Sequence, residues 1–229
     1  MNRKFRYLLP LFVLLASCNT PSTSESSQAE NQEPTIESVM QIINSSLDCT
    51  ELRDEVRIEK DGVTYCDTFT RLRYDQTNEF FFSFYQENSY ADLNSSSPTN
   101  KITNEVYYDG EYSYTLDTDD MYLKVEKEFD VKPIHCSFDF TKIEELNLSV
   151  SGVYQTLTGV IKSANACDFL NVTGKEIEDI SYTSVCNETN LQSIKLSYTQ
   201  NGFNVTRSIE YSYLSINLEL PISIYIKTE

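Results

Sequence analysis

The sequence predicts a mainly β protein of the α+β class, with roughly ten antiparallel strands and a few short helices in one domain. Three observations predict it. Apolar residues alternate with polar ones through most of the chain after residue 50, Asx-Gly pairs separate several of the alternating stretches, and one clear helical repeat stands before them. Long connected hairpins favour a curved meander or an open barrel over a layered α/β fold.

The helical repeat opens the folded part of the chain. Thr35 is suited to cap a helix that begins at residue 36, with Glu37 and Ser38 in its first turn. The spacing predicts an amphipathic helix of about three turns. Its apolar positions are Ile36, Val39, Met40, Ile43 and Leu47.

Tight turns are expected at Asp61-Gly62, Asp109-Gly110 and Asn201-Gly202, because these pairs accept the positive φ angles of a type I′ hairpin. Around them the apolar residues alternate with a period of two. The alternating sets are Phe80, Phe82 and Phe84; Ile102, Val106 and Tyr108; Tyr112, Tyr114 and Leu116; Met121, Leu123 and Val125; Ile194, Leu196 and Tyr198; and Ile209, Tyr211 and Tyr213.

Three further features concern the later part of the chain. The last strand changes phase at Leu214 and continues to Leu220, which predicts a β-bulge that bends the sheet. A short helix is expected over Ser163 to Leu170, and Phe138 to Leu148 is expected to hold a helical turn or two.

The first residues have the organisation of an export signal. Arg3, Lys4 and Arg6 precede a short apolar run, which is too short to cross a bilayer. Leu15-Ala16-Ser17-Cys18 resembles the lipobox of bacterial lipoproteins. That resemblance implies cleavage after Ser17 and acylation of Cys18, so that the protein is anchored to a membrane outside the cytoplasm. The alternative is an ordinary secretory signal with a chance cysteine.

We therefore expect three regions: a signal peptide over residues 1–17, a flexible Ser-, Glu- and Gln-rich tether over residues 18–35, and a folded domain over residues 36–229. The chain has 18 basic and 35 acidic residues and a net charge of −17. The leader holds three bases and no acid, so the mature charge is −20. This charge argues against nucleic acid as a partner and against electrostatic adhesion to anionic lipid, and solubility alone can explain it.

Five cysteines remain besides Cys18, namely Cys49, Cys66, Cys136, Cys167 and Cys186, and none has the spacing of a metal site. An exported chain can form disulfides. We expect the pairs Cys49–Cys66 and Cys167–Cys186, each of which closes a modest loop. The alternative is that all five are buried free thiols.

A resemblance extends over about residues 36–221. Residues 106–114 (VYYDGEYSY), followed by 122–125 (YLKV), resemble the central hairpin of LolA-like and LppX-like envelope lipoproteins. The stretches 159–161, 169–170, 177–182, 193–198 and 216–221 are similar to the C-terminal half of Gram-positive lipoproteins of this superfamily. The resemblance implies a half-barrel whose concave face is covered by the N-terminal helix and short helices, with a hollow that takes acyl chains or other apolar molecules. This chain departs from the family in its extra cysteines and its many aromatic residues.

No catalytic arrangement is evident in the sequence. His135 is the single histidine, and its neighbour Cys136 would point to the opposite face of a strand, so the two are poorly placed as nucleophile and base. The acids of Asp117-Thr118-Asp119-Asp120 could collect calcium, but a solvated turn explains them more simply. We expect no enzyme activity, no cofactor and no metal.

The aromatic residues are the feature with most potential for binding, because an apolar ligand needs an apolar lining. The set expected to line a hollow is Phe80, Phe82, Phe84, Tyr108, Tyr112, Tyr114 and Met121. The alternative is that these side chains only pack beneath the helices. We expect a monomer that holds or carries a lipid or another apolar ligand; the alternative is a non-enzymatic surface lipoprotein with a filled core, which binds a partner at its rim or edge.

Overall fold

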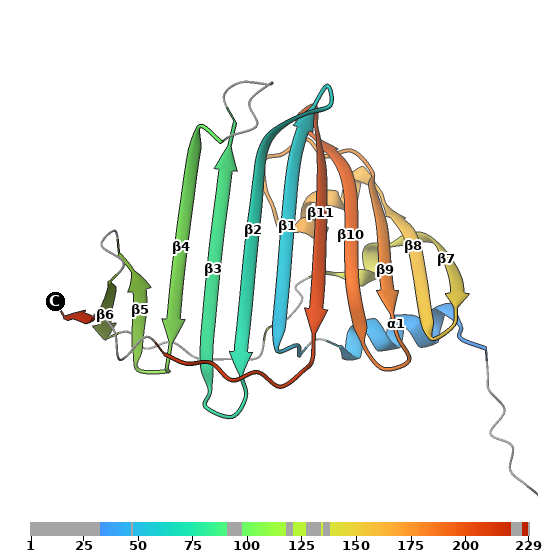
Figure 1. Cartoon of the computed structure of the whole chain (residues 1–229). Coiled ribbons are helices and arrows are strands. Elements are labelled where there is room, and N and C mark those ends of the chain that lie inside the picture. The colour runs from blue at the N-terminus through green and yellow to red at the C-terminus, as the bar shows by residue number, and fades with distance from the viewer. Residues whose placement is uncertain are drawn as a thin grey trace, which may run out of the picture. The chain divides into compact units, whose positions relative to one another are not determined.

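The computed structural model describes residues 33–46, 48–90, 98–117, 121–126, 134, 138–220 and 226–228. The chain divides into two units, Met1–Glu33 and Pro34–Glu229, and the following description concerns the second. Most of its described residues belong to strands (Figure 1). The mainly β class is therefore confirmed.

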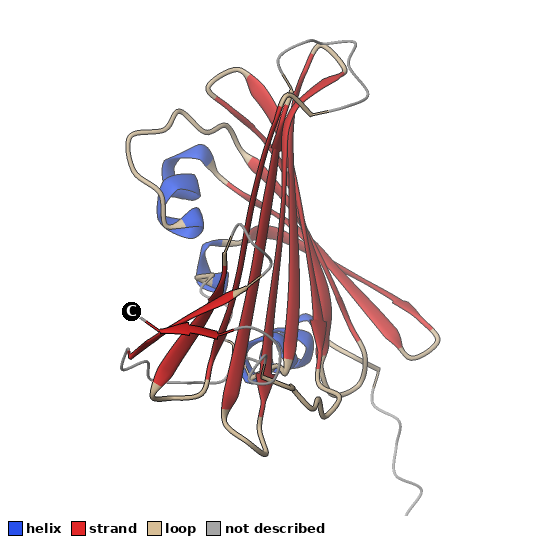
Figure 2. Ribbon diagram, turned by 60° about the vertical axis from the view of Figure 1, so that its left-hand side comes forward, coloured by secondary structure: helices blue, strands red, loops and turns tan. Residues whose placement is uncertain are grey.

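Twelve strands form one sheet in the order β12-β6-β5-β4-β3-β2-β1-β11-β10-β9-β8-β7. Neighbouring strands are antiparallel, except that β12 runs parallel to β6. The sheet is strongly twisted and does not close into a barrel, as expected for a half-barrel (Figure 2). The strands are β1 Glu51–Lys60, β2 Val63–Asp75, β3 Phe80–Ser89, β4 Asn100–Tyr108, β5 Tyr112–Leu116, β6 Tyr122–Glu126, β7 Glu144–Ser151, β8 Tyr154–Ile161, β9 Ile180–Cys186, β10 Leu191–Gln200, β11 Phe203–Ser212 and β12 Ile226–Thr228.

The first helix, α1 (Ile36–Ser45), begins where the sequence predicts it. The Thr35 hydroxyl accepts a hydrogen bond from the Ser38 backbone N–H, and the Ser38 hydroxyl accepts one from the Thr35 N–H. This reciprocal cap satisfies two of the free N–H groups at the helix start. Val39 and Ile43 are fully buried on the face that α1 turns toward the sheet.

The other helices are short. The helix α2 (Ser163–Leu170) confirms the prediction for that segment, and it ends at Asn171, which takes a left-handed conformation. Between β6 and β7 the structure has a single 3-10 turn, η1 (Phe140–Lys142), after which β7 begins at Glu144. The expected helical turn is thus present, but it is shorter than the stretch 138–148.

The register of the strands divides the side chains between two faces, because residues directly opposite one another in a sheet point the same way. One face carries Leu52 of β1, opposite Tyr211 and Leu72, and also Leu196 of β10. We call it the helix face, because its apolar residues form one core with Val39 and Ile43 of α1 and Phe169 of α2. The opposite face carries residues such as Arg53 of β1 and Lys195 of β10, and we call it the outer face.

The core lies mainly over one half of the sheet. α1 packs against β7, β8 and β9, and α2 packs against β8 and η1. The rings of Phe138 and Phe169 stack there with centroids 4.9 Å apart and planes 9° apart. The fully buried residues of this half include Leu157, Ile161, Ile180, Leu191, Ile194 and Leu196.

Two of the three predicted tight turns have the expected geometry. Asp61-Gly62 joins β1 to β2 with φ angles of 53° and 78°, and Asn201-Gly202 joins β10 to β11 with φ angles of 50° and 78°. The third prediction differs in detail: the Asp109 carboxylate accepts hydrogen bonds from the Glu111 and Tyr112 N–H groups, which holds a longer turn in which only Gly110 has positive φ.

Gly159 marks a close approach between β8 and the chain before β7. A Cβ at this position would overlap the Ile143 side chain and lie 2.9 Å from the Glu144 carbonyl oxygen. No side chain fits there unless β7 moves. Glycine is required here for space, whereas at the hairpin turns it is required for positive φ.

The predicted extension of the last strand to Leu220 is wrong. β11 ends at Ser212, and residues 213–220 lie outside any strand. In Figure 1 this stretch, which we call the crossing segment, runs past the ends of β1 to β4 on its way to β12. Its apolar residues alternate with polar ones although it is not a strand, because the segment is only partly buried: Leu218 is buried and Leu214 is exposed.

The buried carboxylate of Asp75 attaches the crossing segment to the sheet. Its Oδ2 accepts hydrogen bonds from the Leu218 N–H and from the Asn78 side chain, and its Oδ1 accepts the Thr77 and Asn78 N–H groups. Burial raises the pKa of Asp75, but these four donors outweigh that effect, so the pKa lies below its ordinary value.

Candidate functional site

Several predicted features lie outside the described residues. Cys18, the leader, the tether up to residue 32, His135 and Cys136 are among them. None of the described helices is both long enough and apolar enough to pass through a membrane.

The helix face of β2 to β6 carries apolar residues beyond the main contacts of the two helices. In one row, Leu72 faces Ser83, which faces Val106 and then Thr115 and Leu123. In the next row, Tyr74 faces Phe81, Tyr108, Ser113 and Val125. We call these the open rows. Leu72 and Phe81 are only partly buried at the margin of the core. Tyr74 and Val106 are buried, whereas Tyr108, Leu123 and Val125 are partly buried. The helix face thus continues beyond the helix-covered half with partly buried apolar side chains, among which Ser83, Ser113 and Thr115 are interspersed.

The helix face becomes more polar toward the opposite ends of the same strands. Asp54, Thr70, Tyr85 and Asn104 form the next row, in which each side chain is half-buried or exposed. The Tyr85 hydroxyl donates a hydrogen bond to Glu87, 2.7 Å away. This bond is the chief cause that raises the pKa of Tyr85 to about 12. An apolar surface that turns polar along the strand direction suits an amphiphilic molecule.

One charged pair lies at the border between the helix-covered core and the open rows. Arg207 of β11 binds both carboxylate oxygens of Asp54, with Nη2 at 2.6 Å and Nε at 2.9 Å from the nearest oxygens. The guanidinium also lies over the Phe138 ring, 5.2 Å from its centroid. Burial lowers the pKa of Arg207, but the bond to Asp54 more than compensates, so the arginine stays charged.

Sequence reasoning missed this pair because its members are 153 residues apart in the chain. A signal for it was present all the same. Arg207 takes an apolar position in the alternation that includes Val205 and Ile209, and a charge at such a position needs a partner.

The predicted aromatic lining is divided between the two faces. Phe82 lies opposite Tyr107, and Tyr107 lies opposite Tyr114, and all three are on the outer face. By the same register Phe80, Phe84 and Tyr112 are on that face too, whereas Tyr108 is on the helix face and Met121 lies in the connection between β5 and β6. The reason is that Tyr107, and not Tyr108, shares a face with the phenylalanines.

The outer-face aromatics pack on one another and bond to carboxylates. Phe82 and Tyr107 have ring centroids 4.8 Å apart, and Tyr107 and Tyr122 have centroids 5.8 Å apart. The Tyr122 hydroxyl donates to Glu105, and the Tyr114 hydroxyl donates to Asp109. Burial and these bonds raise the pKa of both tyrosines. This cluster resembles a small second core more than an empty site.

Next to it on the outer face, three arginines surround one carboxylate. Glu51 accepts Arg53 Nε at 2.7 Å and Arg71 Nη2 at 3.0 Å, and Arg73 Nε lies 3.2 Å from its other oxygen. Burial raises the pKa of Glu51, and the hydrogen bonds from Arg71 and Arg53 lower it by more. The cluster joins β1 to β2 and is partly screened by water.

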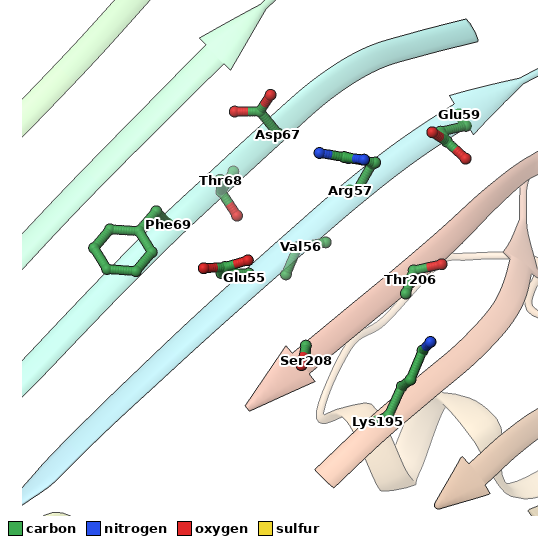
Figure 3. A pocket seen from close by; sticks show the side chains of 10 residues that line it. All are labelled: Glu55, Val56, Arg57, Glu59, Asp67, Thr68, Phe69, Lys195, Thr206 and Ser208. Atoms are coloured by element: carbon green, nitrogen blue, oxygen red, sulfur yellow. The ribbon is translucent and has the colours of Figure 1, made fainter. Parts of the chain in front are cut away.

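The hollows on the described surface are open and rich in polar groups. One of about 610 Å³ lies on the outer face across β2, β1, β11 and β10 (Figure 3). Glu55, Arg57, Asp67 and Lys195 line it, with Phe69 at one side. A second, of about 440 Å³, lies between the end of β11 and the crossing segment. Neither is the apolar hollow that the resemblance implies, because an acyl chain gains nothing by contact with charged groups.

The expected pairs Cys49–Cys66 and Cys167–Cys186 are not present, and Cys66, Cys167 and Cys186 are free thiols. Cys66 lies opposite Ile58, whereas Cys49 precedes β1, so about nine residues at about 3.3 Å each separate them along the strand. Cys167 lies in α2, whereas Cys186 ends β9, six residues beyond Ile180. A disulfide needs Cα atoms within about 7 Å, which these placements do not provide.

The acidic stretch beginning at Asp117 is described only at its first residue. Within the described part of the chain no group of three or more acids, histidines or cysteines is arranged to hold a metal ion. Asp117 uses its backbone N–H to bond the Met121 carbonyl at 2.7 Å, as in a hairpin turn.

The fold and the surface together define a class: an open, twisted antiparallel sheet with helices over half of one face and open hollows on its described surface. LprF from Mycobacterium bovis is a solved structure to which the chain is similar, with 13% sequence identity and a TM-score of 0.43 over 82% of this chain and 98% of that one. No family model and no curated protein sequence matches this chain.

Proposed function

We propose that the protein is a non-enzymatic lipoprotein, anchored outside the cytoplasm through an acylated Cys18, that binds an apolar or amphiphilic molecule on the helix face of β1 to β6. The anchor is inferred from the lipobox-like residues 15–18. The observation that carries the binding function is the extent of the helix face: the helices pack over β7 to β9, and apolar rows continue beyond them onto β2 to β6.

The chemistry of the helix face suggests how the ligand lies. Its apolar part would contact the partly buried Leu72, Phe81 and Tyr108 of the open rows, where contact removes apolar surface from water. Its polar part would lie near Asp54 and Arg207, an ion pair whose side chains are 14% and 27% exposed. A fatty acid or a similar single-chain amphiphile has this distribution of groups.

The proposal is tested with two neighbouring residues of β3 that point to opposite faces. Tyr85 is on the helix face and Phe84 on the outer face, and both are half-buried. We expect Tyr85→Ser to weaken the binding of a fluorescent fatty acid by about tenfold, since a buried aromatic contact is typically worth more than 1 kcal/mol. Phe84→Ser is the matched control and should leave the affinity unchanged.

Native mass spectrometry of the gently purified chain provides a second measurement, which should show a bound lipid besides the covalent one. A chain that retains no lipid and takes up no fatty acid would contradict the binding function. Equal losses in the two variants would instead place the ligand elsewhere.

The alternative is a surface lipoprotein that binds a protein partner at its rim or edge. The filled core beneath α1 and α2 and the polar, open hollows favour it. In that case fatty acid would not bind, and Lys195→Glu in the outer-face hollow would reduce capture of the partner while the melting temperature stayed the same.

A further inference from the structure

The large exposed apolar side chains gather at one end of the sheet. Within the described part of the chain five are exposed: Val150, Val153 and Tyr154 at the β7–β8 turn, Leu214 at the start of the crossing segment, and Ile102 on β4. The first four share one end. The strand register connects them. Gln155, which follows the β7–β8 turn, lies opposite Cys186 at the end of β9, and Cys186 lies opposite Leu191 at the start of β10. Ser193 of β10 lies opposite Glu210, two residues before β11 ends at Ser212, and Leu214 follows that end.

Ile102 is at the other end of the sheet. It lies opposite Glu87 on β3, Glu87 opposite Thr68 on β2, and Thr68 opposite Val56, well along β1 from its start at Glu51. Four of five exposed apolar side chains therefore lie at a single end. Scattered exposed apolar residues need no explanation, but a grouped set marks an interaction surface.

The β7–β8 turn also carries no charged residues. No acidic or basic residue occurs between Glu145 and Lys162, in a chain in which 23% of residues are charged. Within this run Tyr154 is 53% exposed and Val153 is 54% exposed. Tyrosine favours the boundary between water and lipid, where its ring is in an apolar layer and its hydroxyl is hydrated.

The folded unit also begins at this end. In both views the chain enters α1 near the β7–β8 turn (Figures 1 and 2). Fifteen residues separate Cys18 from Pro34, and a flexible Ser- and Glu-rich segment of that length has an end-to-end distance of about 19–23 Å. An acylated Cys18 would thus hold this end of the sheet within reach of the membrane surface.

We propose that the β7–β8 turn, with Val150, Val153 and Tyr154, rests in the interface of the lipid bilayer that anchors the protein. The contact is apolar and shallow, because the acid Glu188 in the adjacent β9–β10 turn stays in the hydrated headgroup layer. It orients the sheet with this end toward lipid and the β4 end of Ile102 away from it. This inference rests on the proposed anchoring through Cys18.

The chain contains no tryptophan, so a single one introduced at a chosen site reports on that site alone. The full acylated chain is reconstituted on phosphatidylethanolamine–phosphatidylglycerol vesicles that contain brominated lipid. With Tyr154→Trp we expect a blue-shifted emission, quenching by the brominated lipid, and acrylamide quenching reduced by about twofold or more relative to detergent-free solution. Ile102→Trp is the matched control, since Ile102 is 46% exposed at the other end, and it should show none of these changes.

Adding Val150→Asp and Val153→Asp to the Tyr154→Trp chain should abolish the shielding while the protein still floats with the vesicles. If the acylated chain floats and the tryptophan at 154 stays open to acrylamide, the contact is refuted and the anchor stands. If the chain does not float, the anchor fails and the contact with it. Shielding that appears without vesicles and grows with protein concentration would mean that a second copy covers the turn, and would also refute the proposal.

Discussion

The carboxylate of Asp75 offers the sharpest test of how the crossing segment is held. Asp75→Asn keeps the size of the side chain and one acceptor oxygen, which can still bind the Thr77 and Asn78 N–H groups at 2.9 and 3.1 Å. The amide NH₂ replaces Oδ2, to which Leu218 and the Asn78 side chain both donate at 2.9 Å. Two donors would then face a donor.

A hydrogen bond to a charged group contributes about 1.5–3 kcal/mol, so the loss of two predicts that the free energy of unfolding falls by about 3–6 kcal/mol. For a domain of this size that corresponds to a decrease in Tm of roughly 6–24 °C. Urea unfolding followed by circular dichroism measures the change. In Asp75→Asn, the Leu218 amide should also exchange its hydrogen faster than the amides in the core of β10 do.

The matched control is Asp61→Asn, an exposed residue at a hairpin turn with φ of 53°, which asparagine adopts readily. It should change the stability by no more than about 0.5 kcal/mol. If Asp75→Asn were as mild as this control, the account of the crossing segment would be refuted.

The pH dependence has a definite sign. The pKa of Asp75 is lower in the folded protein than its ordinary value of 3.8, so its contribution to stability is complete above that value and is lost as the pH falls through the folded pKa. Below about pH 4, the difference in the free energy of unfolding between the wild type and Asp75→Asn should therefore become smaller.

Three further predictions follow from the packing. Gly159→Ala should lower the free energy of unfolding by about 1–3 kcal/mol in urea titrations, because β7 must move to admit a Cβ; a neutral result would contradict the close approach. Asp54→Ala should lower it by about 1–3 kcal/mol, since it leaves the half-buried charge of Arg207 without its partner, and adding Arg207→Met should recover part of the loss in a double-mutant cycle. Cys186, whose pKa burial raises to about 11, should react with a thiol reagent only after unfolding, whereas the half-buried Cys66 should react in the native protein, as peptide mapping by mass spectrometry would show.

Much of the architecture was predictable because it depends on local signals. The Thr35 cap, the helical spacing of Val39 and Ile43, and the left-handed pairs at residues 61–62 and 201–202 each act within a few residues. Residues 213–220 show where such signals fail. Their alternation is that of a strand, but the carboxylate that holds them comes from Asp75, 143 residues away from its partner Leu218.

The candidate site was harder to predict because a shift of one residue moves a side chain to the other face of a sheet. The run Val106-Tyr107-Tyr108 has apolar residues at successive positions, so periodicity does not decide which tyrosine shares a face with Phe82. The pairing register of β3 with β4 decides it, because Phe82 lies opposite Tyr107. The pairing of the cysteines could not be predicted either, because loop length does not reveal that Cys49 and Cys66 lie far apart along the strands.

The order of the strands has a consequence for the order of folding. β1 lies between β2 and β11, and the Thr50 N–H and hydroxyl bond the Ser212 carbonyl across 162 residues of chain. The meanders β1–β6 and β7–β11 can each form from neighbouring hairpins, but the pairing of β1 with β11 has to wait until β11 has been synthesised. The two meanders therefore acquire most of their hydrogen bonds independently, and the strand pair that joins them into one sheet is among the last to form.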